Sequence, residues 1–286
     1  MSDRLRPLWD FDDLDATEVR LRATLEGEPG DEGRAEVLAE LARVEGLRGD
    51  FDAGERLVDE AAALAADGGI AAARIDLERG RLRRSSGDPE AGLPLFESAF
   101  ASANGAGQWF IAADAAHMCA LAAPGPDGFV EWTKKGIALA EERKEASYWA
   151  GPLLNNLGWE HYEAGDLEPA LDAFERALLA RERDPEKQEP IAIARYAVGK
   201  ALRSLGRAEE AIPLLEQSVG WATDGGAPDG WFHEELALEY EAVGRDEDAR
   251  EQARLALPLL EAADPSFAED VDRAGRLREL AAPGPA

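Results

Sequence analysis

The sequence predicts an all-α protein, a right-handed superhelical solenoid of about six helix-turn-helix repeats with capping helices at both ends. Two observations lead to this prediction. Ala, Leu, Glu and Arg dominate a chain of 286 residues that is 45% hydrophobic but only 7% aromatic, and such residues favour helices. A glycine-containing motif also recurs along the chain at a nearly constant interval, which is the sequence signature of a repeat architecture.

The recurring motif is a glycine followed by Asp or Arg. It occurs at Gly49, Gly87, Gly165, Gly206 and Gly244, with separations of 38, 78, 41 and 38 residues. The interval of 78 residues is two periods, so we place a disguised turn in the Pro-Gly-Pro-Asp-Gly stretch of residues 124–128. A glycine ends the first helix of each unit, and acidic residues after it favour the start of the second.

Both helices of each unit carry apolar residues three and four positions apart, and neither helix can bury that face alone. Stacking of successive units would make a continuous core. We therefore divide the chain into a capping helix and linker (1–33), the solenoid (34–263), and a second capping helix with a flexible tail (264–286). The first capping helix is predicted over 13–26, the linker over 27–33 and the final helix over 265–280.

One segment, residues 153–179, resembles a tetratricopeptide repeat. The signature positions are filled by Leu154, Leu157, Gly158, Tyr162, Gly165, Ala170, Phe174 and Ala177. In this family the small residues, here Gly158 and Ala170, permit close approach of the two helices, and Phe174 fills the space between them. The resemblance extends over roughly residues 34–263, although the period is longer than the 34 residues usual in the family.

The charge of the chain bears on its partners. With 59 acidic and 31 basic residues, the net charge is −28, which repels nucleic-acid phosphates and anionic lipid headgroups. We therefore expect neither nucleic acid nor a membrane as a partner. The absence of an apolar leader or a long apolar stretch predicts a cytoplasmic location. The single cysteine, Cys119, excludes an intrachain disulfide and is predicted to be a small core residue.

Signals of catalysis are scarce. The three histidines, His117, His161 and His233, show no metal-ligand spacing, and the glycine-rich stretches lack the Lys-Ser/Thr of a nucleotide-binding loop. We expect no enzyme activity, no metal and no cofactor. Some protein or peptide, unidentified by the sequence, is the expected partner.

The predicted binding surface is the concave face, which the first helix of each pair lines in this fold class. The second, fifth, ninth and twelfth positions of that helix form one stripe. On this stripe basic and aromatic side chains, which commonly anchor binding interfaces, are more frequent than in the chain as a whole. The candidate groove residues are Arg74, Arg81, Asn155, Trp159, Tyr162, Tyr196, Lys200, Arg203, Trp231 and Glu234.

Three hypotheses follow for the function. The first is a protein- or peptide-binding module with a scaffold or adaptor role. The alternative is a peptide-responsive receptor, similar to the quorum-peptide receptors of Gram-positive bacteria. The third is an enzyme with a groove active site, for which Asp114, His117 and Trp159 are the only candidates. The sequence assigns no role to the segment Trp9-Asp10-Phe11 and no oligomeric state.

Overall fold

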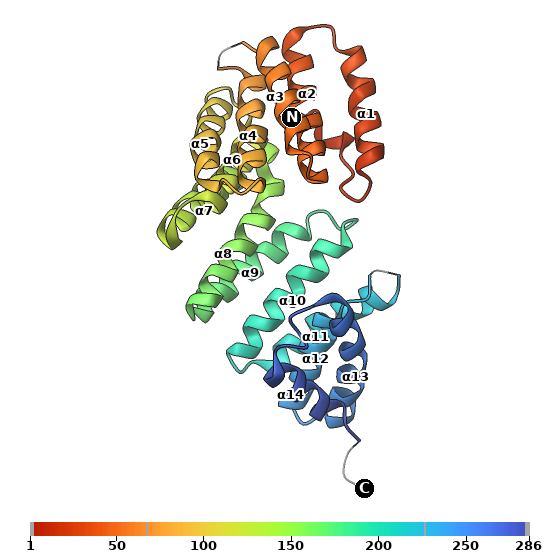
Figure 1. Ribbon diagram of the computed structural model, residues 1–286. Helices are drawn as coiled ribbons and strands as arrows, with labels where there is room; N and C mark the ends of the chain where they lie inside the picture. Colours follow the sequence, from red (N-terminus) through yellow and green to blue (C-terminus); the bar gives the residue numbers. More distant parts are fainter. Residues whose placement is uncertain (1–2, 67, 226, 284–286) are drawn as a thin grey trace. The chain divides into compact units, whose positions relative to one another are not determined.

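A computed structural model describes residues 3–66, 68–225 and 227–283 of the chain. Within these ranges all regular secondary structure is helical and there is no strand, as the all-α prediction requires (Figure 1). The final residues of the predicted flexible tail, 284–286, lie outside the described residues. The helical secondary structure confirms the all-α prediction.

The helices follow one another with short connections. The α-helices are α1 (Leu14–Gly27), α2 (Asp31–Arg48), α3 (Phe51–Leu64), α4 (Ile70–Ser85), α5 (Pro89–Gly105), α6 (Trp109–Ala122), α7 (Gly125–Glu142), α8 (Ala150–Ala164), α9 (Leu167–Arg181), α10 (Gln188–Ser204), α11 (Ala208–Thr223), α12 (Gly230–Ala242), α13 (Asp246–Ala263) and α14 (Val271–Ala281). Two short 3-10 helices, η1 (Arg6–Leu8) and η2 (Lys144–Trp149), precede α1 and α8. From α2 to α13 the chain forms six successive helix pairs, as the sequence predicts.

The five predicted glycine turns lie between the two helices of a pair. All five glycines have positive φ, from 72° at Gly206 to 100° at Gly87, a conformation that costs glycine little. After two of them an aspartate caps the next helix: Asp50 accepts from the Ala53 amide at 2.9 Å and Asp88 from the Ala91 amide at 3.1 Å. The disguised turn also exists, but it is shorter than predicted because α7 already begins at Gly125 (φ 71°).

Small residues let paired helices approach closely, as the family resemblance implies. A Cβ added to Gly158 of α8 would lie 2.4 Å from the ring of Phe174 in α9, and one added to Gly80 of α4 would lie 2.5 Å from Phe96 in α5. Both phenylalanines and Ala170 are fully buried. The aromatic ring therefore occupies the space that a larger side chain would need.

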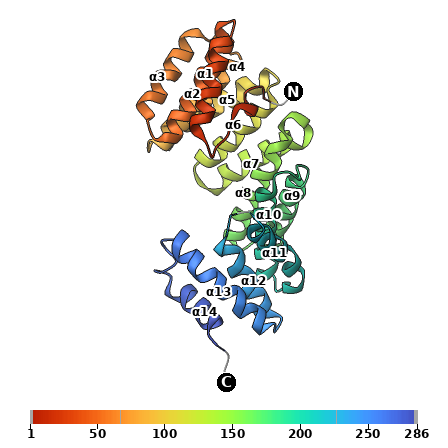
Figure 2. The same ribbon diagram turned by 90° about the vertical axis from the view of Figure 1, so that its right-hand side faces the viewer.

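The chain divides into two compact units, with the division inside α8 after Leu153. The N-terminal unit has a core over α1–α4 and another over α4–α7, where Cys119 is fully buried as predicted. The C-terminal unit has a core over α9–α13 and another between α12, α13 and α14. Figure 2 shows the two sets of helices from a second direction. The two units do not test the predicted division into capping helices and solenoid, which stays a prediction.

The ends of the predicted terminal segments differ from the prediction. α1 lies where expected and is capped by Asp13, but α2 begins at Asp31, so the linker is only residues 28–30. The final helix begins at Val271 instead of Pro265, because residues 265–269 form turns and Asp270 supplies the cap by accepting from the Arg273 amide at 3.1 Å.

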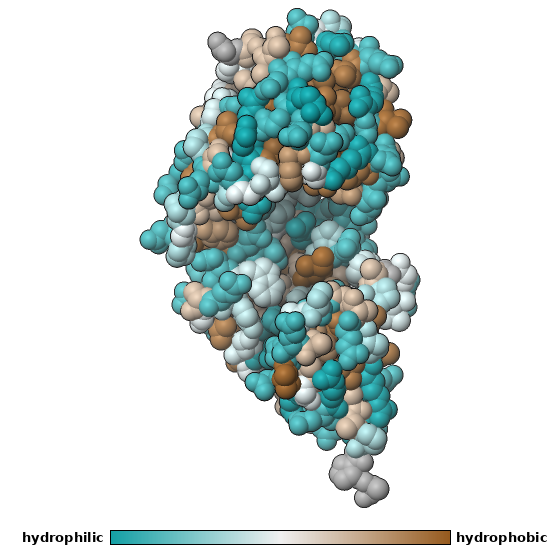
Figure 3. All heavy atoms as spheres, viewed as in Figure 1, coloured by the Kyte–Doolittle hydropathy of each residue, from teal (hydrophilic) through white to brown (hydrophobic). Residues whose placement is uncertain are grey.

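The surface reflects the acidic, charged composition. Figure 3 shows hydrophilic side chains over much of one face, with hydrophobic residues interspersed among them. None of the helices in the described part of the chain combines the length and the apolar character needed to cross a bilayer.

Candidate functional site

The ten predicted groove residues fall into two groups. Arg74 and Arg81 belong to α4 of the N-terminal unit, and the other eight belong to α8, α10 and α12 of the C-terminal unit. Because the two groups belong to different units, each is described within its own unit. Whether these residues contact a partner stays a prediction.

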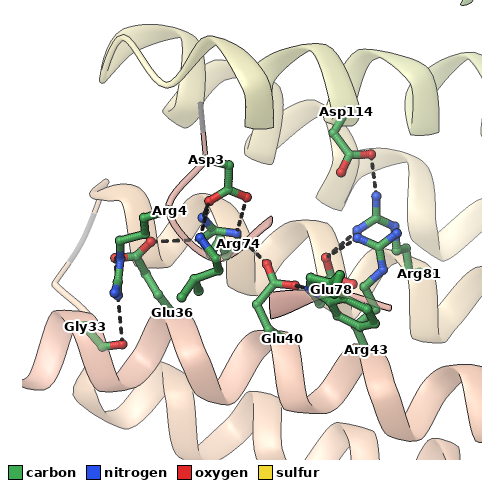
Figure 4. A network of polar contacts seen from close by, with 12 residues as sticks. Asp3, Arg4, Gly33, Glu36, Glu40, Arg43, Arg74, Glu78, Arg81 and Asp114 are labelled. Atoms are coloured by element: carbon green, nitrogen blue, oxygen red, sulfur yellow. Dashed lines mark hydrogen bonds and ion pairs between the residues drawn. The ribbon is translucent and has the colours of Figure 1, made fainter. Parts of the chain in front are cut away.

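Arg74 lies at the centre of a buried set of carboxylates (Figure 4). Its guanidinium donates to Glu36 at 2.9 Å and to Glu40, both in α2, and to Asp3 at 3.1 Å. Only 5% of the Arg74 side chain is exposed. Arg74 is thus engaged by the chain's own acids, since each of its three guanidinium nitrogens donates to a carboxylate.

Arg81 is engaged in the same way. It pairs with Glu78, one turn away in α4, and with Asp114 of α6. Arg43 lies 3.9 Å from Glu78. Although burial favours the neutral form of Asp114, the positive charges of Arg81 and Arg43 hold its pKa below the usual value. Burial raises the pKa of Glu78 above the usual value, despite the same two arginines.

These contacts change the charge expected for this surface. We call it the acidic–arginine network and define it by Glu36, Glu40, Arg43, Arg74, Glu78, Arg81 and Asp114. It holds four carboxylates against three guanidiniums, so the predicted local excess of positive charge does not exist here. The stripe seemed basic in the sequence because Glu40 and Glu78, which pair with Arg74 and Arg81, lie beside the stripe and not on it.

The aromatic residues of the C-terminal unit lie mostly against one another. Trp159 packs edge-on against Tyr162 and Phe174, with ring centroids 5.6 and 5.0 Å apart. The Tyr162 hydroxyl lies 2.8 Å from the Ser204 hydroxyl, so α8 and α10 are neighbours at this point. Trp159 and Tyr162 are half-buried, so each ring is part packing and part surface.

The basic residues of α10 meet one carboxylate of α12. Lys200 Nζ lies 3.4 Å from Glu235, and Arg203 donates to both oxygens of the same carboxylate. The Glu235 side chain is 2% exposed, while those of Lys200 and Arg203 are 26% and 32% exposed. Burial opposes the charge of Lys200, but Glu235 outweighs it, so the pKa of Lys200 stays above its usual value.

Tyr196 completes this arrangement. Its ring lies 5.5 Å from that of Phe232, and the Lys200 ammonium lies 5.7 Å from its centroid. We call the residues Trp159, Tyr162, Tyr196, Lys200, Arg203 and Glu235 the aromatic–basic surface. It presents two partly exposed cations, one buried anion and three half-buried aromatic rings.

A pocket of about 480 Å³ adjoins this surface at the end of α10. It is lined by Arg203, Gly206, Arg207, Ala208, Glu209, Glu210, Glu239, Ala242 and Val243. Glu239 is fully buried, and neither carboxylate oxygen has a hydrogen-bond partner among the described residues. Burial and the nearby Glu235 raise the pKa of Glu239 to about 7, with Arg203 acting in the opposite direction.

The three remaining predicted residues have different surroundings. Asn155 is half-buried on α8. Trp231 packs against the core between α12, α13 and α14. Glu234 accepts from Arg273 of α14 at 2.7 Å, so it ties the final helix to α12 and is already paired.

Two of the candidates for catalysis, Asp114 and His117, lie one turn apart on α6. Asp114 is ion-paired with Arg81, and His117 Nδ1 has no hydrogen-bond partner in the described part of the chain. His117 packs against Trp149, with ring centroids 5.4 Å apart, and burial lowers its pKa to about 4. Trp159 belongs to the other unit.

Sequence reasoning missed Glu235 and Glu239. In a chain with 59 acids, an acidic residue at any position carries little information, and neither residue lies on the predicted stripe. Lys200 and Arg203, which contact Glu235, do lie on that stripe. Acidic residues beside the basic stripe, on the first helix of the following repeat, are the sequence signal that would have identified both glutamates.

Comparisons with known proteins agree on the fold. The sequence profile of the tetratricopeptide repeat matches residues 192–224, which cover most of α10 and all of α11. A comparison with curated protein sequences gives no match.

Three solved structures illustrate the similarity. The apo form of RapI has a TM-score of 0.72 at 10% identity, covering 96% of this chain and 79% of that one. The anaphase-promoting-complex hetero-tetramer Cut9–Hcn1 gives 0.62 at 15% identity, covering 96% of this chain. The apo quorum sensor NprR from B. thuringiensis gives 0.59 at 12% identity, covering 97% of this chain and 85% of that one.

Identities of this size show a shared fold. The chain spans about half (48%) of the chain it matches in the Cut9–Hcn1 structure. Residues 192–224 therefore match a tetratricopeptide repeat, and the chain shares the fold of these three solved structures.

Proposed function

We propose that the protein is a binding module whose aromatic–basic surface holds an extended acidic segment of a partner protein. The observation that carries the proposal is the charge arrangement on α10 and α12: Lys200 and Arg203 share the single carboxylate of Glu235. The net charge of the chain repels anions at long range, but Glu235 is buried and the two cations are partly exposed, so a partner carboxylate can contact them directly.

The chemistry of the surface favours such a segment. Hydrogen bonds between charged groups are stronger than neutral ones, and Arg203 offers a planar guanidinium suited to a carboxylate. Trp159, Tyr162 and Tyr196 supply the large, half-buried rings that commonly carry binding energy in interfaces. We propose that the protein binds its partner without catalysing a reaction. We also propose that this partner is a protein or a peptide. The cytoplasmic location stays a prediction of the sequence.

The test is a titration of fluorescent nine-residue peptides, one panel rich in Asp and Glu and one rich in Lys and Arg, against the whole chain. Acidic peptides are expected to bind more tightly. Arg203→Gln should weaken that binding at least about tenfold, since a hydrogen bond to a charged group contributes roughly 1.5–3 kcal/mol. Trp159→Ala should weaken it as well.

The matched control is Arg195→Gln. Arg195 lies on the same helix, α10, but donates to Glu182 at 3.4 Å and is not part of the aromatic–basic surface. Its replacement should leave peptide affinity unchanged. Equal affinity for wild type, Arg203→Gln and Trp159→Ala would remove this surface from the binding function.

A ligand-responsive receptor is the second candidate. The observation in its favour is the similarity of fold to the quorum sensor NprR over 97% of this chain. A receptor of this kind should change its dimensions when an acidic peptide binds. Small-angle scattering with and without a saturating peptide distinguishes the two, because a simple binding module keeps the same radius of gyration.

A further inference from the structure

The leading segment, residues 3–11, lies on the acidic–arginine network of the N-terminal unit. Asp3 meets Arg74, and Arg4 donates to Glu36 at 3.1 Å and to the Gly33 carbonyl at 3.3 Å (Figure 4). The Asp3 side chain is 7% exposed, so its carboxylate is withdrawn from water against Arg74. The chain therefore places one of its own segments on the predicted groove stripe.

The middle and end of the segment are held by apolar and aromatic contacts. Leu5 is fully buried in the core of α1–α4. Trp9 donates from Nε1 to Glu40 at 2.7 Å, and the Arg43 guanidinium lies 5.1 Å from the Trp9 ring and 5.3 Å from the Phe11 ring. Trp9 and Phe11 stack with centroids 5.0 Å apart. The segment Trp9-Asp10-Phe11 thus has a structural role that the sequence did not assign.

The segment is bound in the way a peptide is bound. Apart from the single 3-10 turn of η1 it has no regular secondary structure, and it contacts α2 and α4 through side chains. Besides the contacts of Arg4 and Phe11, three groups of the segment contact α2, α4 and the core: a carboxylate at position 3, a leucine two residues later and a tryptophan six residues after the carboxylate. These three define a recognition pattern.

The network does not depend on the segment for its charge balance. Without Asp3, Arg74 keeps Glu36 and Glu40 as partners, so no guanidinium is left without a carboxylate. The segment is also partly open to solvent, because the Arg4 side chain is 43% exposed and Phe11 is 44% exposed. A second segment with the same three groups can therefore replace it group by group.

We propose that this face is a docking site for an extended segment of a partner protein that carries Asp, then Leu two residues later, then Trp six residues after the Asp. Residues 3–11 occupy the site within the chain and compete with the partner. An occupant tethered to its own site has an effective concentration on the order of millimolar, so a partner binds only when its affinity or concentration exceeds that threshold. This proposal concerns the N-terminal unit and is independent of the acidic-peptide surface on α10.

The test uses the full chain and a labelled peptide of residues 3–11, Asp-Arg-Leu-Arg-Pro-Leu-Trp-Asp-Phe, with blocked ends. Asp3→Asn together with Trp9→Ala weakens the tethered segment without changing α2 or α4. Fluorescence anisotropy should show the peptide binding to this double variant at least tenfold more tightly than to wild type. A peptide with the same two replacements should bind neither protein.

The matched control is Asp12→Asn, a charge change just after the segment on an exposed residue. It should bind the peptide as wild type does. Arg203→Gln should also leave this binding unchanged, which separates the present proposal from the function proposed above.

If the double variant loses its helical circular dichroism, amide hydrogen exchange of the wild-type protein tests the docking proposal instead. In wild type, an excess of peptide should speed amide hydrogen exchange within residues 8–10, whose amides are held by Leu5, Arg6 and Thr17 when the segment is docked. Exchange in α10 should not change. Absence of both binding and displacement would overturn the proposal. Dimerisation of wild type through exchanged segments would overturn the partner assignment in favour of a second copy of the chain.

Discussion

Glu239 carries a fully buried carboxylate with no hydrogen-bond partner among the described residues. Its pKa is raised to about 7 from an ordinary value of 4.5 because burial and Glu235 disfavour the charged form. The folded protein therefore binds this proton more tightly than the unfolded chain does. Consequently the stability that the neutral form contributes is present at low pH and is lost as pH rises from about 4.5 to 7.

Glu239→Gln should remove this dependence on pH, because the amide does not ionise. Between pH 4.5 and pH 8 the free energy of unfolding of wild type should fall relative to that of the variant by about 3 kcal/mol, because the pKa of Glu239 is about 7 in the folded protein and about 4.5 in the unfolded chain. Urea denaturation at several pH values measures the difference. The control is Glu251→Gln, an exposed residue of α13, which should run parallel to wild type. Parallel curves for Glu239→Gln would show that its carboxyl ionises normally.

Whether the ion-pair partner of a residue can be predicted depends on how far apart the two residues are in the sequence. The pairing of Arg81 with Glu78, three residues away on one helix, follows from helical geometry. The pairing of Arg81 with Asp114 and of Arg74 with Asp3 joins residues 33 and 71 positions apart. No local pattern identifies such partners, so the sequence did not show that the groove arginines pair with acids of other helices.

At the scale of helices, the repeat positions predicted by family resemblance were confirmed. The glycines between paired helices have positive φ, and Gly158 faces Phe174 across the α8–α9 pair. Helix ends were less predictable. Pro265 follows an aspartate and looked like a helix start, but α14 begins only at Val271, since the intervening residues form turns.

Gly158→Ala tests the close approach of α8 and α9. The new Cβ would lie 2.4 Å from the Phe174 ring, which is fully buried and cannot move freely, so the variant should lose roughly 1–3 kcal/mol of stability. The matched control is Gly275→Ala in α14, where no atom lies within 4 Å of the added Cβ. That replacement should be neutral or stabilise by up to about 1 kcal/mol. Urea denaturation measures both, and equal stabilities would contradict the packing argument.

For the whole molecule, a net charge of −28 sets up self-repulsion that the internal ion pairs only partly offset. Raising sodium chloride from 10 to 500 mM shortens the distance over which exposed charges interact from about 30 Å to a few ångströms. The thermal midpoint should therefore rise, by roughly 2–4 °C for each kcal/mol of repulsion removed. Tetramethylammonium chloride at equal ionic strength is the control for specific ion effects. A falling midpoint would mean that the screened ion pairs outweigh the repulsion.

The amino-acid sequence by itself determined the helices, the glycine turns and the close packing within each repeat, because these depend on residues near one another in the chain. Only the tertiary structure decided the state of the predicted groove. It placed Glu235 beneath Lys200 and Arg203, filled the surroundings of Arg74 and Arg81 with carboxylates, and set residues 3–11 on that face. Electrostatic partners come from any part of the chain that folding brings near, and their positions are fixed only when helices pack.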